Sequence, residues 1–151
     1  MRATLSVAPL IALLAACQAN VNVSSGPTPE YVTAPGASSS LPFSPVVRVG
    51  NMLYLAGQLG TDSKGQLVPG GIAAETRQIM ENIKALVFAN GSSMDRVVKC
   101  TVMLADINEW AAMNAVYVTY FPNHKPARSA FGTSGLARNG RAEIECMALA
   151  G

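Results

Sequence analysis

The sequence predicts a single α+β domain with the element order β-β-α-β-α-β-β, preceded by an export signal and a flexible segment. Short β-rich runs bounded by Gly, Pro and Asn predict the strands, and two segments with apolar residues at three- and four-residue steps predict the helices. The chain has 151 residues, of which 50% are hydrophobic and 13% charged, and this suits one compact core. Both helices are available to cover one face of a single mixed sheet.

The first half of the domain is predicted as a hairpin followed by a helix. Two β-rich runs, 46–49 and 52–56, are joined at Gly50-Asn51, a dipeptide suited to positive φ in a tight turn. From 72 to 89, apolar residues return on one face of a helix while charged residues take the other positions, and Asn90-Gly91 follows as a stop signal.

The second half is predicted as strand, helix, strand, strand. Residues 96–104 alternate, so Val98, Cys100, Val102 and Leu104 are expected on one face. A helix capped by Asp106 or Asn108 ends before Pro122, and two strands follow at 127–133 and 143–149. One apolar face of this helix is expected to consist of Trp110, Met113, Val116, Tyr117 and Tyr120.

The second face of this sheet has no cover from its own chain. Apolar strand residues on that face would remain in water, so an oligomer that packs sheet against sheet is expected.

The N-terminus has the pattern of an exported lipoprotein. Residues 1–16 place Arg2 ahead of an apolar run that ends in small residues, as in a secretory signal peptide. Leu14-Ala15-Ala16-Cys17 resembles a lipobox, in which Cys17 is lipidated; an ordinary signal cut after Ala19 is the alternative. Residues 17–41 are predicted as a flexible tether and 42–151 as the domain, located in the cell envelope or periplasm, with a lipid anchor as its only membrane contact.

Composition argues against several functional classes. The net charge is +2 and the charges are scattered singly, so no nucleic-acid partner is expected. His124 has no Cys or carboxylate at ligand spacing, so no metal is expected. Catalytic signatures such as GxSxG and a Gly-rich phosphate loop are missing from the sequence. Cys100 and Cys146 lie in predicted strands and can form a disulfide or remain buried thiols.

Polar residues inside apolar strands are the remaining candidates. A buried Arg128 needs either an acidic neighbour such as Glu143 or an anionic ligand, because an unpaired buried charge is costly. Glu143 and Glu145 share one strand face, where Glu145 is expected in solvent and Glu143 is left open. Asn114 can face water or complete a pocket, and composition favours exposure.

Four stretches resemble the RidA (reactive intermediate deaminase, or YjgF-type) family in order and spacing. They are "LPFSPVVRVGNMLYLAGQLGTD", "ETRQIMENIKALVFANGSSMDRVVKCTVMLADINEWAAMNAVYVTYFP", "KPARSAF" and "AEIECMALA". The similarity extends from Leu41 almost to the C-terminus, and "GQLG", "KPARS" and "EIE" are specific in combination. The resemblance implies a chorismate-mutase-like fold and a homotrimer with three ligand clefts between subunits.

The resemblance also implies an activity that needs no cofactor. Active members hydrolyse 2-imino or 2-enamino acids to 2-oxo acids and ammonia. By the same resemblance, Arg128 falls on the carboxylate-binding arginine and Glu143 on the residue that holds water and moves its proton. Asn114 would shape the cleft, and Gly57 and Ala130 would offer backbone contacts.

Three positions depart from the family pattern. Phe43 replaces the usual tyrosine and lacks its hydroxyl, Ala56 replaces a serine, and Ala130 replaces a cysteine. The implied pocket is therefore more apolar than that of the archetype. A non-catalytic trimer that binds small carboxylates, or a holdase-like module, is the alternative function.

Overall fold

The computed structural model describes residues 26–33 and 41–151. The predicted signal peptide and Cys17 lie outside the described residues. The elements are β1 (Glu30–Val32), β2 (Val46–Val49), β3 (Met52–Leu55), β4 (Gln58–Leu59), α1 (Gly71–Ala89), η1 (Met94–Arg96), β5 (Val97–Leu104), η2 (Ile107–Glu109), α2 (Trp110–Tyr117), η3 (Val118–Tyr120), β6 (Ala127–Gly132), η4 (Ala137–Asn139) and β7 (Ala142–Leu149).

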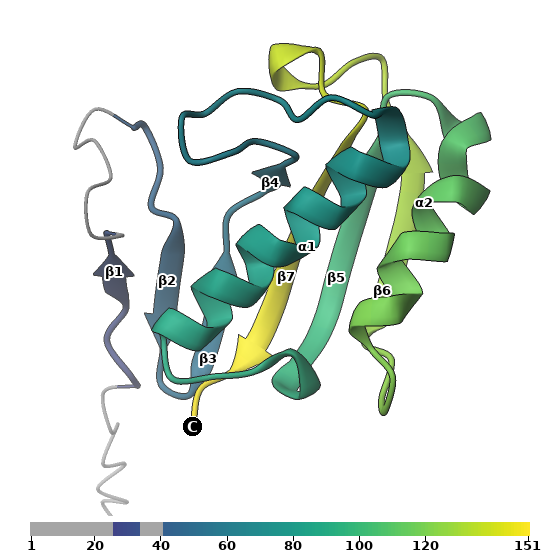
Figure 1. The fold of residues 1–151 in the computed structure, drawn as a ribbon. Helices are drawn as coiled ribbons and strands as arrows, with labels where there is room; N and C mark the ends of the chain where they lie inside the picture. Colours follow the sequence, from purple (N-terminus) through teal and green to yellow (C-terminus); the bar gives the residue numbers. More distant parts are fainter. Residues whose placement is uncertain (1–25, 34–40) are drawn as a thin grey trace, which may run out of the picture.

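The described strands form one mixed sheet in the order β1-β2-β3-β7-β5-β6, with β4 beside β7. Among these strands, β5 and β6 pair in parallel, and the other pairs are antiparallel. Figure 1 shows α1 and α2 packed on the same face of the sheet. The α+β class and the placement of both helices on one face are therefore confirmed.

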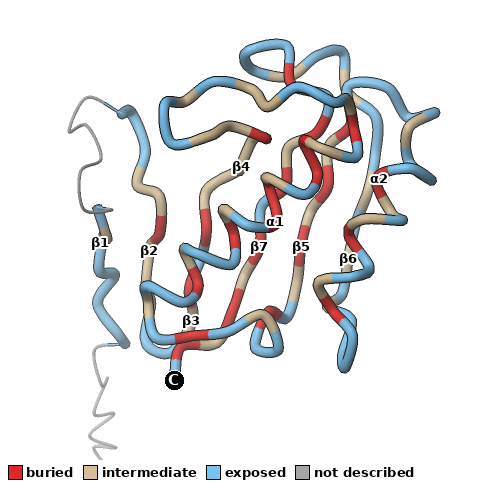
Figure 2. The backbone as a smooth tube through the Cα atoms, in the orientation of Figure 1, coloured by how far each residue is buried: buried red, intermediate tan, exposed pale blue. Residues whose placement is uncertain are grey.

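The core lies between the sheet and the two helices, where buried and exposed positions alternate along the central strands (Figure 2). Helix α1 forms because its apolar residues return every three or four positions, and Ile79, Met80 and Ile83 are fully buried beneath it. The helix ends at Ala89, and Asn90 caps it before Gly91 with φ +73°, as the stop signal predicts.

Strand β1 corrects part of the predicted tether. Glu30–Val32 lies inside the 17–41 segment, yet it pairs antiparallel with β2 and extends the sheet by one strand. Glu30 also lies 3.8 Å from Arg48 of β2. The sequence does not predict this strand, because it has only three residues and lies in a segment rich in Pro, Gly and Ser. Its hydrogen bonds depend on the exposed edge of β2.

A register shift in β5 changes the predicted face of one residue. The pairing of β5 with β7 is irregular between Val97 and Lys99. Beyond the shift, Cys100, Val102 and Leu104 are buried as predicted, but Val98 is 40% exposed and Val97 takes the buried position instead. A bulge inserts one extra residue, so the alternation reverses on its far side.

Cys100 and Cys146 form a disulfide between β5 and β7. The two residues are directly opposite in the antiparallel register, with their Cα atoms 4.1 Å apart, and both are buried on the helix-covered face. The sequence left a disulfide and two free thiols open, and the structure contains the disulfide.

The other face of the sheet carries a mixture of apolar and charged side chains. The register places Tyr54, Met147, Met103 and Phe131 on this face together with Lys99 and Glu145. Tyr54 and Phe131 are 40% and 47% exposed, and both helices lie on the opposite side. Large apolar groups are thus open to solvent within one chain.

Candidate functional site

Arg128 lies at the edge of the sheet, next to helix α2. Strand β6 is an edge strand, and its alternation directs Arg128 and Ala130 to the helix-covered face beside Cys100 and Val102 of β5. The Nη1 atom of Arg128 donates a hydrogen bond of 2.6 Å to Oδ1 of Asn114. Arg128 therefore has a neutral partner, not the acidic neighbour that the sequence allowed for.

Helix α2 supplies all the groups around this guanidinium. Trp110, Asn114 and Tyr117 follow one another at steps of four and three residues, so they lie on one face of the helix. The guanidinium carbon of Arg128 lies 4.7 Å from the centre of the Tyr117 ring and 5.8 Å from that of Trp110. These distances permit cation–π attraction, which holds the arginine in place and leaves donors for a ligand.

The local sequence explains the start and the end of this helix. The side chain of Asp106 accepts a hydrogen bond from the backbone N–H of Asn108 and caps the η2 turn that leads into α2, as predicted. Met113 and Tyr117 are buried as predicted, but Trp110 is 44% exposed. Trp110 therefore lies beside the Arg128 guanidinium and is not part of the buried core.

A cavity of about 540 Å³ opens beside Arg128 between α2 and β6. Its size falls within the usual range for small-molecule sites. Most of its lining is apolar, and its polar groups come from Asn114, Arg128 and Lys125. Burial raises the pKa of Tyr117 to about 12, partly offset by the charge of Arg128, so the phenol stays neutral at physiological pH.

A second group of candidate residues gathers around the start of β7. The carboxylate of Glu143 lies against Gly57, so closely that a Cβ at position 57 would overlap its Oε1 atom. Gly57 and Phe43 also line a separate cavity of about 330 Å³. Phe43 is 54% exposed, which leaves its ring open to another chain.

One chain does not bring Arg128 and Glu143 together. Arg128 is level with Cys100 and Cys146 on the helix-covered face, whereas Glu143 pairs with Met103 on the open face. The Cα atoms of Arg128 and Glu143 lie two strands apart across the sheet and three residues apart along it. This offset corresponds to a separation of about 14 Å. Asn114 therefore belongs with Arg128, and Gly57 and Phe43 belong with Glu143.

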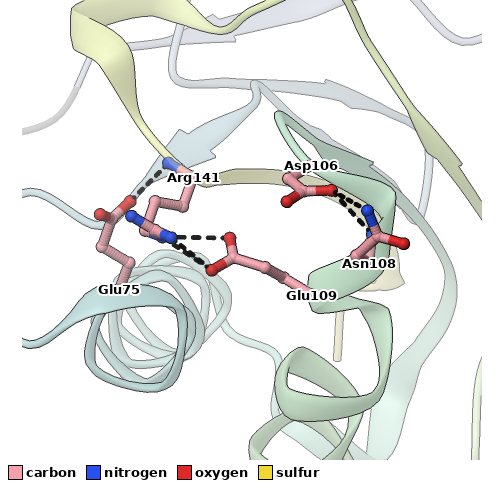
Figure 3. Close-up of polar contacts among 5 residues, drawn as sticks. All are labelled: Glu75, Asp106, Asn108, Glu109 and Arg141. Carbon is pink, nitrogen blue, oxygen red and sulfur yellow. Dashed lines mark hydrogen bonds and ion pairs between the residues drawn. The ribbon is translucent and has the colours of Figure 1, made fainter.

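A polar network fixes the start of β7, just before Glu143 (Figure 3). The backbone N–H of Arg141 donates to the buried carboxylate of Glu75 on α1 at 2.8 Å. The Arg141 guanidinium binds Glu109 of η2, with Nη2 2.5 Å from Oε1. This network connects α1, η2 and β7, and thereby sets the position of Glu143 relative to the helices.

Ala130 and three residues that sequence reasoning did not assign complete the description. Ala130 lies two residues beyond Arg128, on the same face of β6. The sequence predicts Trp110 and Tyr117 as core residues, because aromatic positions at helical spacing are usually core. Lys125 could have been identified from the sequence, because it is a second cation only three residues before Arg128 in "KPARS".

Metal ligation and membrane spanning have no structural basis within residues 26–33 and 41–151. No group of three or more His, Cys, Asp or Glu side chains in these ranges is arranged to hold a metal ion. No helix in the described part of the chain is both long and apolar enough to cross a bilayer.

Comparison of the sequence and of the fold places the chain among known proteins. Residues 33–150 match the family described as Endoribonuclease L-PSP, and the chain belongs to this family, which is also called RidA or YjgF. The 2-iminobutanoate/2-iminopropanoate deaminase of the goat, Capra hircus, is 44% identical over 120 residues, covering 79% of this chain and 88% of the relative.

Solved structures agree with the fold. RidA from the Antarctic bacterium Psychrobacter sp. PAMC 21119 has a TM-score of 0.70 and 34% identity, covering 83% of this chain and 99% of its own. E. coli TdcF with bound serine has a TM-score of 0.71 and 32% identity, covering 78% of this chain and 94% of its own.

Proposed function

We propose that this protein hydrolyses reactive 2-imino and 2-enamino acids to 2-oxo acids and ammonia. The proposal rests on the surroundings of Arg128. Asn114, Tyr117 and Trp110 hold its guanidinium at the edge of a cavity. Among the described residues, Arg128 has no carboxylate partner. The name of the goat relative supports the same reaction type.

Arg128 would bind the substrate carboxylate. A guanidinium fork matches two carboxylate oxygens with two parallel N–H···O bonds, each contributing about 1.5–3 kcal/mol. Asn114 occupies Nη1 as an acceptor, which orients the fork without neutralising its charge. The apolar walls of the cavity lower the local dielectric around this ion pair and thereby strengthen it.

Glu143 would act on the same substrate from a neighbouring subunit. In a homotrimer in which the open sheet face of one chain meets the β6 edge of the next, the Glu143, Gly57 and Phe43 side of the first chain can complete the Arg128 side of the second. The split arrangement within one chain supports such a shared cleft, because about 14 Å separates the two Cα atoms.

The chemistry requires only positioning and proton transfer. Glu143 accepts a proton from water as the oxygen attacks the imine carbon, giving a carbinolamine. The substrate in this sequence is the protonated imine, so the carbinolamine is neutral. The proton held by Glu143 then moves to the nitrogen, and Glu143 takes the hydroxyl proton as the C–N bond breaks, which releases ammonia and leaves the 2-oxo acid. An imine is already electrophilic, so no covalent intermediate with the protein is needed.

The direct test measures hydrolysis of 2-iminopropanoate generated in situ by an amino-acid oxidase. The purified protein should accelerate ammonia release over the uncatalysed rate, and Arg128→Ala should remove most of that acceleration. Phe43→Tyr should leave it unchanged or raise it, because it restores a hydroxyl beside the cleft. Lys84→Ala, on the exposed side of α1, is the matched control.

Two results would contradict the proposal in different ways. No acceleration by the parent protein excludes the enzyme and favours a non-catalytic carboxylate-binding or holdase-like trimer, a reading that the missing hydroxyl at Phe43 also supports. Full activity of Arg128→Ala shows that a different site performs the reaction.

We further propose that the protein is an exported lipoprotein anchored through Cys17. The support is the apolar run over residues 7–16 that ends at Leu14-Ala15-Ala16-Cys17. Expressed in a bacterium, the parent should fractionate with membranes, and Cys17→Ser should move it to the soluble fraction because the acylated thiol is lost. Unchanged fractionation of Cys17→Ser contradicts the anchor.

A further inference from the structure

The cavity beside Arg128 contains a second cation. Lys125 and Arg128 both line it, and Pro126 lies between them on the same wall. Three residues of extended chain span at most about 10 Å between the Cα atoms of Lys125 and Arg128. Both side chains are flexible and several ångströms long, so one small molecule can reach both charged groups.

The two cations differ in how firmly they are held. Arg128 is half-buried and is fixed by Asn114 and two aromatic rings. Lys125 is exposed, and within the described residues neither it nor Arg128 has a carboxylate within 4 Å. A firmly held cation and a solvent-exposed cation therefore share one cavity.

The rest of the cavity lining is uncharged. Ala115, Val118, Phe121 and Pro126 contribute apolar surface, and no Asp or Glu lines the cavity. A ligand with a single carboxylate uses Arg128 and leaves Lys125 in water. A ligand with two carboxylates separated by a short apolar segment satisfies both cations and covers the wall between them.

We propose that Lys125 is a specificity-determining residue that makes the site prefer acids with a second, distal carboxylate. The substrates are then 2-imino dicarboxylic acids, the imines that oxidation of acidic amino acids produces. This inference rests on the proposed function for the reaction, but the preference for a dianionic ligand can be measured without any reaction.

The size of the preference follows from the exposure of Lys125. Solvent-exposed ion pairs are weak, so the distal carboxylate should improve binding by about two- to fivefold at low salt. The improvement should shrink as the ionic strength rises, since exposed charges are screened.

The test compares two product-like probes with the same five-carbon chain. Calorimetric titration should show that 2-oxoglutarate binds about two- to fivefold more tightly than 2-oxopentanoate, which lacks the distal carboxylate. In Lys125→Met, whose side chain keeps the length but not the charge, the ratio should fall to about one. Lys84→Met, outside this cavity, should keep the parent ratio.

Three outcomes overturn the proposal: equal binding of both probes to the parent, binding of neither probe, or a preference that survives in Lys125→Met. If the imine assay fails while the binding ratio and its loss are found, the proposed reaction is wrong and the dicarboxylate preference stands. If hydrolysis is found without the binding preference, the reaction stands and the role of Lys125 is wrong.

Discussion

At the residue scale, the Tyr117 hydroxyl is the least expected feature of the site. Tyr117 is 6% exposed, and its hydroxyl has no hydrogen-bond partner among the described residues. Its ring packs 5.0 Å from Phe121 and lies beneath the Arg128 guanidinium. The ring therefore has a clear packing role, whereas the buried hydroxyl carries a desolvation cost.

Tyr117→Phe should consequently stabilise the protein. It keeps the ring beneath Arg128 and removes an unpaired buried hydroxyl, which should raise the free energy of unfolding by about 1 kcal/mol at neutral pH. Urea denaturation of both proteins at pH 7 measures the change. A loss of stability would show that the hydroxyl has a partner in the assembled protein.

The stability of Tyr117→Phe relative to the parent should also depend on pH. The pKa of Tyr117 is raised to about 12 in the folded chain, while an unfolded tyrosine ionises near 10. Above pH 10 the unfolded state binds fewer protons, so the stability of the parent falls as pH rises towards 12. The Tm advantage of Tyr117→Phe should therefore widen over that interval, and a constant difference would contradict the assignment.

The candidate residues could be chosen from the sequence, but their contacts could not. "KPARS" and "EIE" identify Arg128 and Glu143 through the resemblance. The pairing of Arg128 with Asn114 joins a helix to an edge strand, and composition instead favoured an exposed Asn114. Trp110 and Tyr117 fit a core pattern equally well, because aromatic side chains at helical spacing serve both purposes.

At the element scale, the disulfide between β5 and β7 should make a large contribution to stability. The cysteines are 46 residues apart, and closing a loop of that length constrains the unfolded chain by about 4 kcal/mol. Replacing both residues in Cys100→Ala/Cys146→Ala should lower the free energy of unfolding by up to this amount, measured by urea denaturation.

A reductant provides the control for this prediction. Dithiothreitol should destabilise the parent but leave the double variant unchanged. Peptide mapping of the unreduced parent should recover Cys100 and Cys146 in one cross-linked peptide. Recovery of two free thiols from protein secreted into an oxidising compartment would contradict the bond.

Elements with strong periodicity were predicted well, and short or irregular ones were not. Helix α1 and strands β2, β3, β6 and β7 agree with their predicted ranges to within about two residues, as expected for clear hydrophobic patterns. Strand β4 has two residues, too few for any alternation, and β1 depends on β2 for its pairing. The bulge between Val97 and Lys99 is a pairing defect that the sequence of β5 alone does not encode.

At the scale of the whole molecule, the proposed cleft shared between subunits predicts complementation between inactive variants. Arg128→Ala and Glu143→Gln should each be inactive alone. When the two chains are unfolded and refolded together, about a quarter of the clefts receive an intact Arg128 side and an intact Glu143 side, so about a quarter of the parent activity should return.

A second mixture provides the matched control. Arg128→Ala and Asn114→Ala damage the same side of the cleft, so no mixed trimer contains an intact pair of these residues and no such recovery is expected. Subunit exchange is verified with a tagged chain in both mixtures. Absence of recovery with Glu143→Gln, despite exchange, would contradict a shared cleft.

Strand β1 also limits how far the domain could extend from a membrane. If Cys17 carries a lipid, the number of residues between it and the sheet is fixed by Glu30, which is paired with β2, and only residues 18–29 lie between them. Residues 18–29 span at most about 40 Å when fully extended, whereas residues 18–41 would span about 80 Å. The domain would then work within roughly one bilayer thickness of the lipid surface.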